Sequence, residues 1–111
     1  MKSSEIRITV TLGDDQIPDK LEWQAIDSGV EGKKEAAAVL LSMWDPNERS
    51  TYRIDLWTRT MMIDDMQRFF FENMMTLAET YQRATQDDKW PEEIRRFAQD
   101  FAVKTGVLKG T

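Results

Sequence analysis

The sequence predicts an α+β protein in which a four-stranded antiparallel sheet is covered on one face by two C-terminal helices. Before residue 58, apolar residues recur at every second position in several short runs, which is the period of half-buried strands. After Asp64 the apolar period changes to that of an α-helix. The chain contains no internal repeat and no long linker, so we expect one domain over residues 1–111.

The first two strands are predicted near the N-terminus. Apolar and polar residues alternate from Ile6 to Leu12, and Gly13-Asp14-Asp15 then supplies turn-forming residues. A second alternation follows Pro18 and runs from Leu21 to Ala25. We expect this second strand to return beside the first.

The third and fourth strands are predicted to form a hairpin. Glu35 to Ala38 favours a helix by composition, whereas Val39 to Trp44 favours a strand, and we assign a strand from about Ala37 onward. Asp45-Pro46-Asn47 is typical of a turn with Pro at its second position, and the alternation resumes from Thr51 to Thr58.

The expected register of this hairpin divides its residues between two faces. If Trp44 pairs with Thr51, cross-strand partners share a side of the sheet. One side then carries only apolar residues, and we expect the helices to cover it. These residues are Val39, Leu41, Met43, Tyr52, Ile54 and Leu56.

Two amphipathic helices are predicted after the sheet. The first runs from Asp64, its expected N-cap, to about Thr85. Its apolar stripe consists of Met66, Phe70, Asn73, Met74, Leu77, Tyr81 and Ala84, with the Asn73 amide expected to bond to backbone groups. The second helix has Trp90-Pro91-Glu92-Glu93 as its first turn and ends at Gly106. Its expected buried face is Ile94, Phe97, Ala98 and Phe101.

The side-chain inventory argues against an enzyme. The chain has no His and no Cys, so the usual proton shuttle, thiolate nucleophile and soft-metal ligands are absent. Pairs of acidic residues occur at 14–15, 64–65, 87–88 and 92–93, but each lies at an expected turn or helix start. A hard cation such as Mg²⁺ or Ca²⁺ could still use them, although no EF-hand spacing is present. We therefore expect no catalytic residues, no metal and no cofactor.

Charge and hydropathy narrow the expected partners. The net charge of −5 and the pI near 4.7 disfavour nucleic acid and anionic membranes. No segment approaches the roughly 20 apolar residues that span a bilayer, and residues 1–5 lack an apolar signal region. We expect a cytoplasmic protein with no membrane insertion.

Several large or charged side chains are left over from the predicted core. The second face of the hairpin carries two Trp residues among polar ones, and two apolar residues of the first helix lie well off its main stripe. Large apolar side chains rimmed by charge are typical of an interface. We expect a homo-oligomer or a protein partner to bind there. The predicted interface residues are Leu40, Trp44, Arg53, Asp55, Trp57, Phe71 and Met75.

Four segments carry a family resemblance. They are Lys20-Leu21-Glu22-Trp23, Leu40 to Asp45, Arg53 to Thr58 and Tyr81 to Asp87. In this order and spacing the chain resembles the gliding motility-associated protein GldC family from Ser4 to about Phe101. The resemblance implies a small cytoplasmic accessory protein of bacterial gliding motility with no established enzymatic activity. It supplies no catalytic or ligand residues.

The order of four strands and then two helices is also similar to the export chaperone SecB. This is a likeness of topology without a shared motif, and a fold does not imply a function. Two hypotheses therefore stand: an adaptor acting through protein–protein interaction in gliding motility, or a SecB-like chaperone that binds client polypeptides. A defined stoichiometric partner would favour the adaptor, and promiscuous binding of unfolded chains would favour the chaperone.

Overall fold

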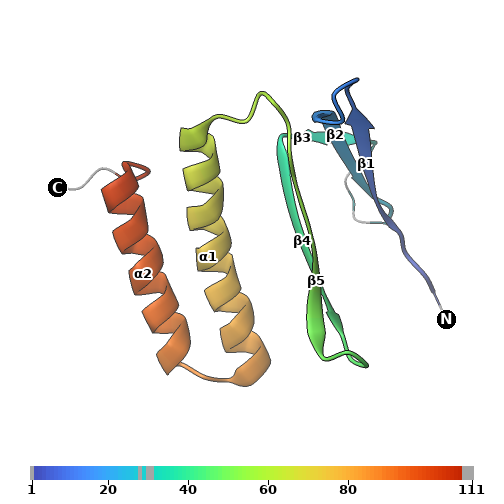
Figure 1. Cartoon of the computed structure of the whole chain (residues 1–111). Helices are drawn as coiled ribbons and strands as arrows, with labels where there is room; N and C mark the ends of the chain where they lie inside the picture. The colour runs from blue at the N-terminus through green and yellow to red at the C-terminus, as the bar shows by residue number, and fades with distance from the viewer. Residues whose placement is uncertain (1, 28, 30–31, 109–111) are drawn as a thin grey trace. The chain divides into compact units, whose positions relative to one another are not determined.

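The structure is a computed structural model that describes residues 2–27, 29 and 32–108, in which five strands precede two helices (Figure 1). The predicted α+β class is confirmed. The predicted single four-stranded sheet is not what forms, because the strands make a three-stranded sheet in the order β1-β2-β3 and a two-stranded sheet, β4-β5. The chain divides into two compact units, Met1–Met61 and Met62–Thr111. Compact units can still unfold together, so the single domain stays a prediction, as does the covering of a sheet face by the helices.

The three-stranded sheet has β2 (Pro18–Ala25) at its centre. β1 (Ile6–Leu12) pairs with it antiparallel, as predicted, with Val10 opposite Leu21. Leu21 is fully buried. The sequence did not predict β3 (Lys34–Ala36), which pairs with the other edge of β2. The local helical preference there is overridden, because strand pairing supplies hydrogen bonds that a short helix could not.

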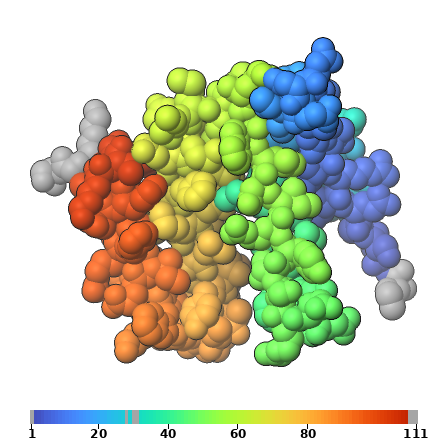
Figure 2. Space-filling view, viewed as in Figure 1, coloured from blue at the N-terminus to red at the C-terminus, as the bar shows by residue number. Residues whose placement is uncertain are grey.

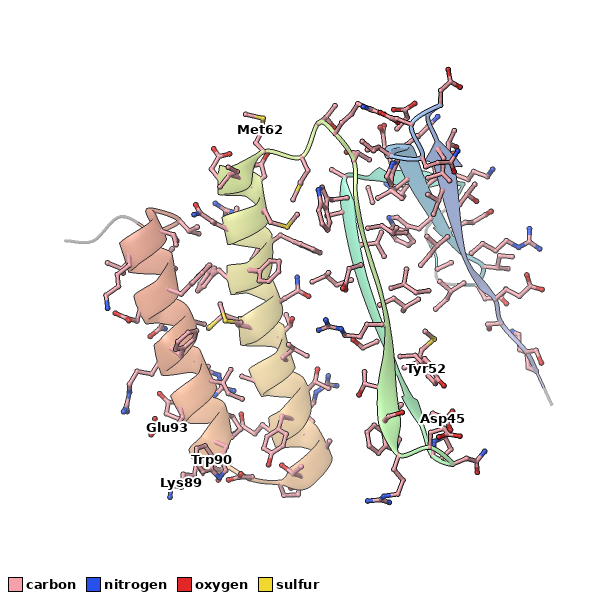
Figure 3. All side chains as sticks on the ribbon, viewed as in Figure 1. Asp45, Tyr52, Met62, Lys89, Trp90 and Glu93 are labelled. Carbon is pink, nitrogen blue, oxygen red and sulfur yellow. The ribbon has the colours of Figure 1, made fainter. Side chains whose placement is uncertain are left out.

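The two-stranded sheet is a hairpin of β4 (Ala38–Asp45) and β5 (Ser50–Trp57). Its register pairs Trp44 with Thr51, so the predicted division of residues between the two faces is confirmed. Asp45 makes the turn, and Figure 3 shows it at the end of the hairpin. Its Oδ1 accepts hydrogen bonds from the backbone N–H groups of Asn47 and Glu48 at 2.9 and 3.2 Å.

Arg59 connects the chain after β5 to the turn between β1 and β2 and to the start of β2. Its Nε donates to Asp19 Oδ1 at 2.7 Å and its Nη2 to Asp15 Oδ1 at 2.8 Å. Gly13 leaves room for the side chains of Asp19 and Arg59, since a Cβ there would lie 2.8 Å from Asp19 Oδ2 and 3.0 Å from Arg59 Nη2. Nothing in the sequence spacing identifies these partners, because the Arg59 and Asp15 side chains meet across 44 residues.

The second unit is a pair of helices, α1 (Ile63–Thr85) and α2 (Lys89–Thr105). Both ends predicted from the sequence are confirmed: Gln86 caps α1 with φ of 62° and Gly106 caps α2 with φ of 85°. The predicted N-cap is wrong. The N-cap lies two residues earlier, at Met62, and Asp64 lies in the first turn of α1. Its Oδ1 accepts only from the neighbouring Asp65 N–H, because it already lies inside the helical turn.

Small residues let the two helices approach each other. Ala78 of α1 and Ala98 and Ala102 of α2 are fully buried. Gln82 adds polar contacts, accepting from Arg95 Nη2 at 2.6 Å and donating to Asp88 at 2.9 Å. The space-filling view shows side chains of α1 and α2 in contact (Figure 2). The most deeply buried side chains between the two helices are therefore small ones.

The predicted apolar stripes are therefore only partly buried. In α1, Phe70, Leu77 and Tyr81 are exposed, whereas Met66, Asn73 and Met74 are half-buried. The prediction for Asn73 is confirmed, since its Nδ2 donates to the Phe69 carbonyl at 2.7 Å. In α2, Phe97 is exposed instead of buried. The helical period aligned these residues correctly, but the contact face between the helices is shifted toward the alanines.

Candidate protein interaction site

One face of the β4–β5 hairpin carries most of the predicted interface residues. Because cross-strand partners share a side, the register gathers them from both strands. We call this surface the tryptophan face. It consists of Leu40, Ser42, Trp44, Thr51, Arg53, Asp55 and Trp57.

The tryptophan face is an elongated strip, with its aromatic residues at the two ends. Trp44 lies opposite Thr51 near the turn, whereas Trp57 lies opposite Ala38, six residues away along β4. At about 3.3 Å per residue the two Trp residues are roughly 20 Å apart. Trp44 is 59% exposed and Trp57 is 55% exposed. Two large aromatic side chains are therefore presented to solvent from one rigid hairpin.

The middle of the tryptophan face is charged. Arg53 Nη2 lies 3.7 Å from Asp55 Oδ2, and both side chains are exposed. An exposed pair at this distance contributes little to folding. Both groups therefore remain able to form hydrogen bonds and ion pairs with an incoming partner.

The opposite face of the hairpin is continuously apolar. It pairs Val39 with Leu56, Leu41 with Ile54, and Met43 with Tyr52. We call these six residues the apolar ladder. The end near the turn is open, since Met43, Tyr52 and Ile54 are exposed (Figure 3 labels Tyr52). Sequence reasoning assigned the whole ladder to the core, so these exposed side chains were missed as surface residues.

Phe71 and Met75 lie elsewhere, on α1. With Ala78 and Gln82 they follow the helical spacing of one face, and Gln82 bonds to Arg95 of α2. Both side chains are half-buried. The local reason for their position off the main stripe is thus the contact face with α2, and their role in binding another molecule stays a prediction.

Comparison with known families matches residues 18–107 to the family described as gliding motility-associated protein GldC-like. The chain belongs to this family. The resemblance found in the sequence is thereby confirmed, and membership associates the chain with gliding motility. No curated protein and no solved structure gives a significant match.

Several acidic side chains of this GldC-like chain hydrogen-bond to nearby backbone groups. Asp15 accepts from the Ile17 N–H at 3.1 Å and Asp87 from the Lys89 N–H at 2.9 Å, as expected of turn residues. The Arg59 guanidinium, which donates a hydrogen bond to Asp15, holds the pKa of that carboxyl below its ordinary value of 3.8, and the Ile17 N–H contributes in the same direction. Within the described residues, no three or more carboxylates gather where they could hold a metal ion.

Two further properties concern the helices and the surface of the three-stranded sheet. Across the described residues, neither helix combines the length and apolar character needed to span a bilayer. A depression of about 120 Å³ on the three-stranded sheet is lined by Arg7, Thr9, Glu22, Trp23, Gln24 and Lys33. Its volume suits a few water molecules better than an organic ligand.

Proposed function

We propose that this chain is a non-enzymatic, cytoplasmic accessory subunit of gliding motility that binds a protein partner through its tryptophan face. The observation that carries the proposal is the pair of exposed Trp residues, Trp44 and Trp57, on one face of a hairpin. Trp and Arg are the residues that most often dominate binding energy at protein interfaces. The tryptophan face has both types, with Arg53 between the two aromatics.

The size of the exposed aromatic surface sets the strength expected of this contact. A Trp side chain buries about 150–250 Å² when it is fully covered. Because Trp44 and Trp57 are each more than half exposed, covering both would bury roughly 200 Å². At about 25 cal/mol per Å² this is worth about 5 kcal/mol before the cost of association. A binding energy of this size fits reversible binding to a partner of defined structure.

The proposed absence of catalysis rests on chemistry. The chain has no His and no Cys, so a Ser or Thr nucleophile would lack the usual base. Asp15, Asp19 and Asp87 already accept hydrogen bonds from backbone or Arg59 donors. A general acid or base needs a perturbed carboxyl near a substrate pocket, and the depression beside Glu22 is too small for that role.

The test replaces Trp44 and Trp57 together by Ser in the native host. We expect the variant to keep the circular dichroism of the wild type and to lose gliding motility. A matched control replaces Met43 and Tyr52 by Ser, because these residues are similarly exposed on the opposite face of the same hairpin. Photo-crosslinking amino acids at 44 and 57 should join the chain to one partner at fixed stoichiometry. Normal gliding and no crosslink with a folded double variant would refute the proposal.

The SecB-like chaperone is the second candidate. It is favoured by the number of large apolar side chains exposed on the helices, including Leu77 and Phe97. A holdase binds many unfolded chains through apolar surface and needs no particular partner. Suppression of aggregation of an unrelated unfolded protein, lost when Leu77 and Phe97 become Ser but kept without the two Trp residues, would favour this function over the adaptor.

A further inference from the structure

The outer edge of β1 is open. β1 is the terminal strand of its sheet, and among the described residues no strand pairs with its second side. Ile26 donates its N–H to the Glu5 carbonyl, so the odd-numbered residues of β1 direct their backbone groups toward β2. Antiparallel geometry then turns the N–H and C=O groups of Ile6, Ile8 and Val10 outward. They form a row of hydrogen-bonding groups that no described strand pairs with.

From Ile6 to Thr11 this edge lacks the features that normally prevent strand pairing, and the register shift between Thr11 and Leu12 lies at its end. Proteins protect edges with Pro, Lys, bulges or charges that point toward the core. β1 reads IRITVTL: it has no Pro and no Lys, and its one charged residue, Arg7, lies on the polar side. Five of its seven residues are β-branched, which favours an extended strand. Ile6 is 77% exposed.

We propose that two copies of this chain pair antiparallel through β1, with Thr9 facing Thr9 of the second copy across a two-fold axis. In this register all seven residues overlap. Ile6 then lies opposite Leu12 of the second copy, and Ile8 lies opposite Val10. Each sheet face continues unchanged from one copy into the other, because the pairing keeps apolar residues with apolar ones. Two three-stranded sheets become one of six strands.

Charge favours the antiparallel orientation over the parallel one. Each copy carries a net charge of −5, but β1 itself contains no acidic residue. Antiparallel pairing sets Arg7 opposite the neutral Thr11, whereas parallel pairing would set Arg7 beside Arg7. A two-fold contact also closes on itself and leaves no further β1 edge open, so it forms a dimer and not a filament.

Cysteine crosslinking tests the register directly, because the chain has no Cys of its own. Facing residues of a pair that is not hydrogen-bonded have Cα atoms about 4.5 Å apart, which suits a disulfide. Thr9→Cys should therefore form a covalent dimer under mild oxidation. Arg7→Cys is the matched control, because the two introduced thiols would be separated by about four residues, or ~14 Å, along the strands.

A charge variant tests the dimer without a covalent bond. Within one copy Thr9 lies opposite Glu22, so Thr9→Lys gains a favourable neighbour and should fold. Across the two-fold axis the same change brings two Lys together. We expect light scattering to show a dimer for the wild type and for Thr76→Lys, an equal charge change on exposed α1 surface, and a monomer for Thr9→Lys.

Mixing two charge variants should rescue the dimer. Thr9→Lys combined with Thr9→Glu should restore dimers that contain one copy of each. A wild-type protein that stays monomeric at millimolar concentration, with no more crosslinking at position 9 than at position 7, overturns the proposal. Binding of an extended peptide along β1 in that case would assign the edge to another protein. These outcomes are independent of the tryptophan face, so the two proposals fail separately.

Discussion

Replacing Leu21 by Ala tests which apolar residues form the core of this protein. Leu21 is the largest fully buried aliphatic side chain among the described residues and lies between Val10 of β1 and Ala36 of β3. Leu→Ala at a buried site costs about 2–5 kcal/mol, through lost transfer energy and the cavity left behind. The cost here should lie within this range, because a central strand held from both sides can close such a cavity only partly.

The matched control is the same change at Leu77, which is 62% exposed on α1. Its cost should be within about 0.5 kcal/mol, since little apolar surface is covered and Ala favours a helix. Urea unfolding measures both variants. With a slope of about 1–3 kcal/mol per M, Leu21→Ala should lower the midpoint by about 1 M or more. Equal midpoints for the two variants would refute the description of the core.

Two optical probes in the same experiment test the single-domain prediction. Helical circular dichroism reports on α1 and α2, whereas three of the four Trp residues lie in the first unit. If the two units unfold together, Leu21→Ala shifts both signals to the same midpoint. If only the fluorescence midpoint moves, the units unfold independently and the chain is two domains.

Two further predictions concern charged side chains. Arg59→Gln should raise the pKa of Asp15 toward its ordinary value of 3.8. Because the pKa of Asp15 is lower in the folded state, its stabilising contribution is present above the unfolded pKa and is lost as the pH falls through the folded pKa. Carboxyl NMR titration measures the pKa, and urea midpoints below about pH 4 measure the loss of stability. An unchanged Asp15 titration in the variant would contradict the contact. Asp64→Ala should cost only about 0.3–1 kcal/mol, the worth of a carboxylate near a helix N-terminus, because Asp64 makes no cap hydrogen bond. A loss near 2 kcal/mol in the free energy of unfolding, measured with urea, would instead support Asp64 as the N-cap.

Local patterns predicted most of the elements. The register of the β4–β5 hairpin followed from the Asp45-Pro46-Asn47 turn and the two alternations beside it, since a slip of one residue would exchange the two faces. The end of α1 near Thr85 followed from the helical period of its apolar residues, and the end of α2 at Gly106 followed from capping chemistry. Each of these features depends on residues close in sequence, which is why the sequence alone was sufficient.

Features that join distant residues were not predicted. β3 forms because β2 offers it an edge, and the local composition of Glu35 and Ala36 argues for a helix. The contacts of Arg59 with Asp15 and Asp19 depend on where the turn after β1 comes to lie. One local feature was also missed: the N-cap of α1 is Met62, which makes no side-chain cap hydrogen bond, so capping chemistry did not identify it.

The candidate site divides in the same way. The sequence by itself determined that Trp44, Trp57, Arg53 and Asp55 share one face, because the strand period and the turn decide this locally. Only the tertiary structure decided which apolar residues are buried. Ala78, Ala98 and Ala102 fill the helix contact while Leu77 and Phe97 remain exposed, because the closeness of two helices depends on the size of side chains from both. The period of the sequence predicts on which face of a helix or strand a side chain lies. Its burial depends on a second element that packs against that face, and the local sequence does not identify that element.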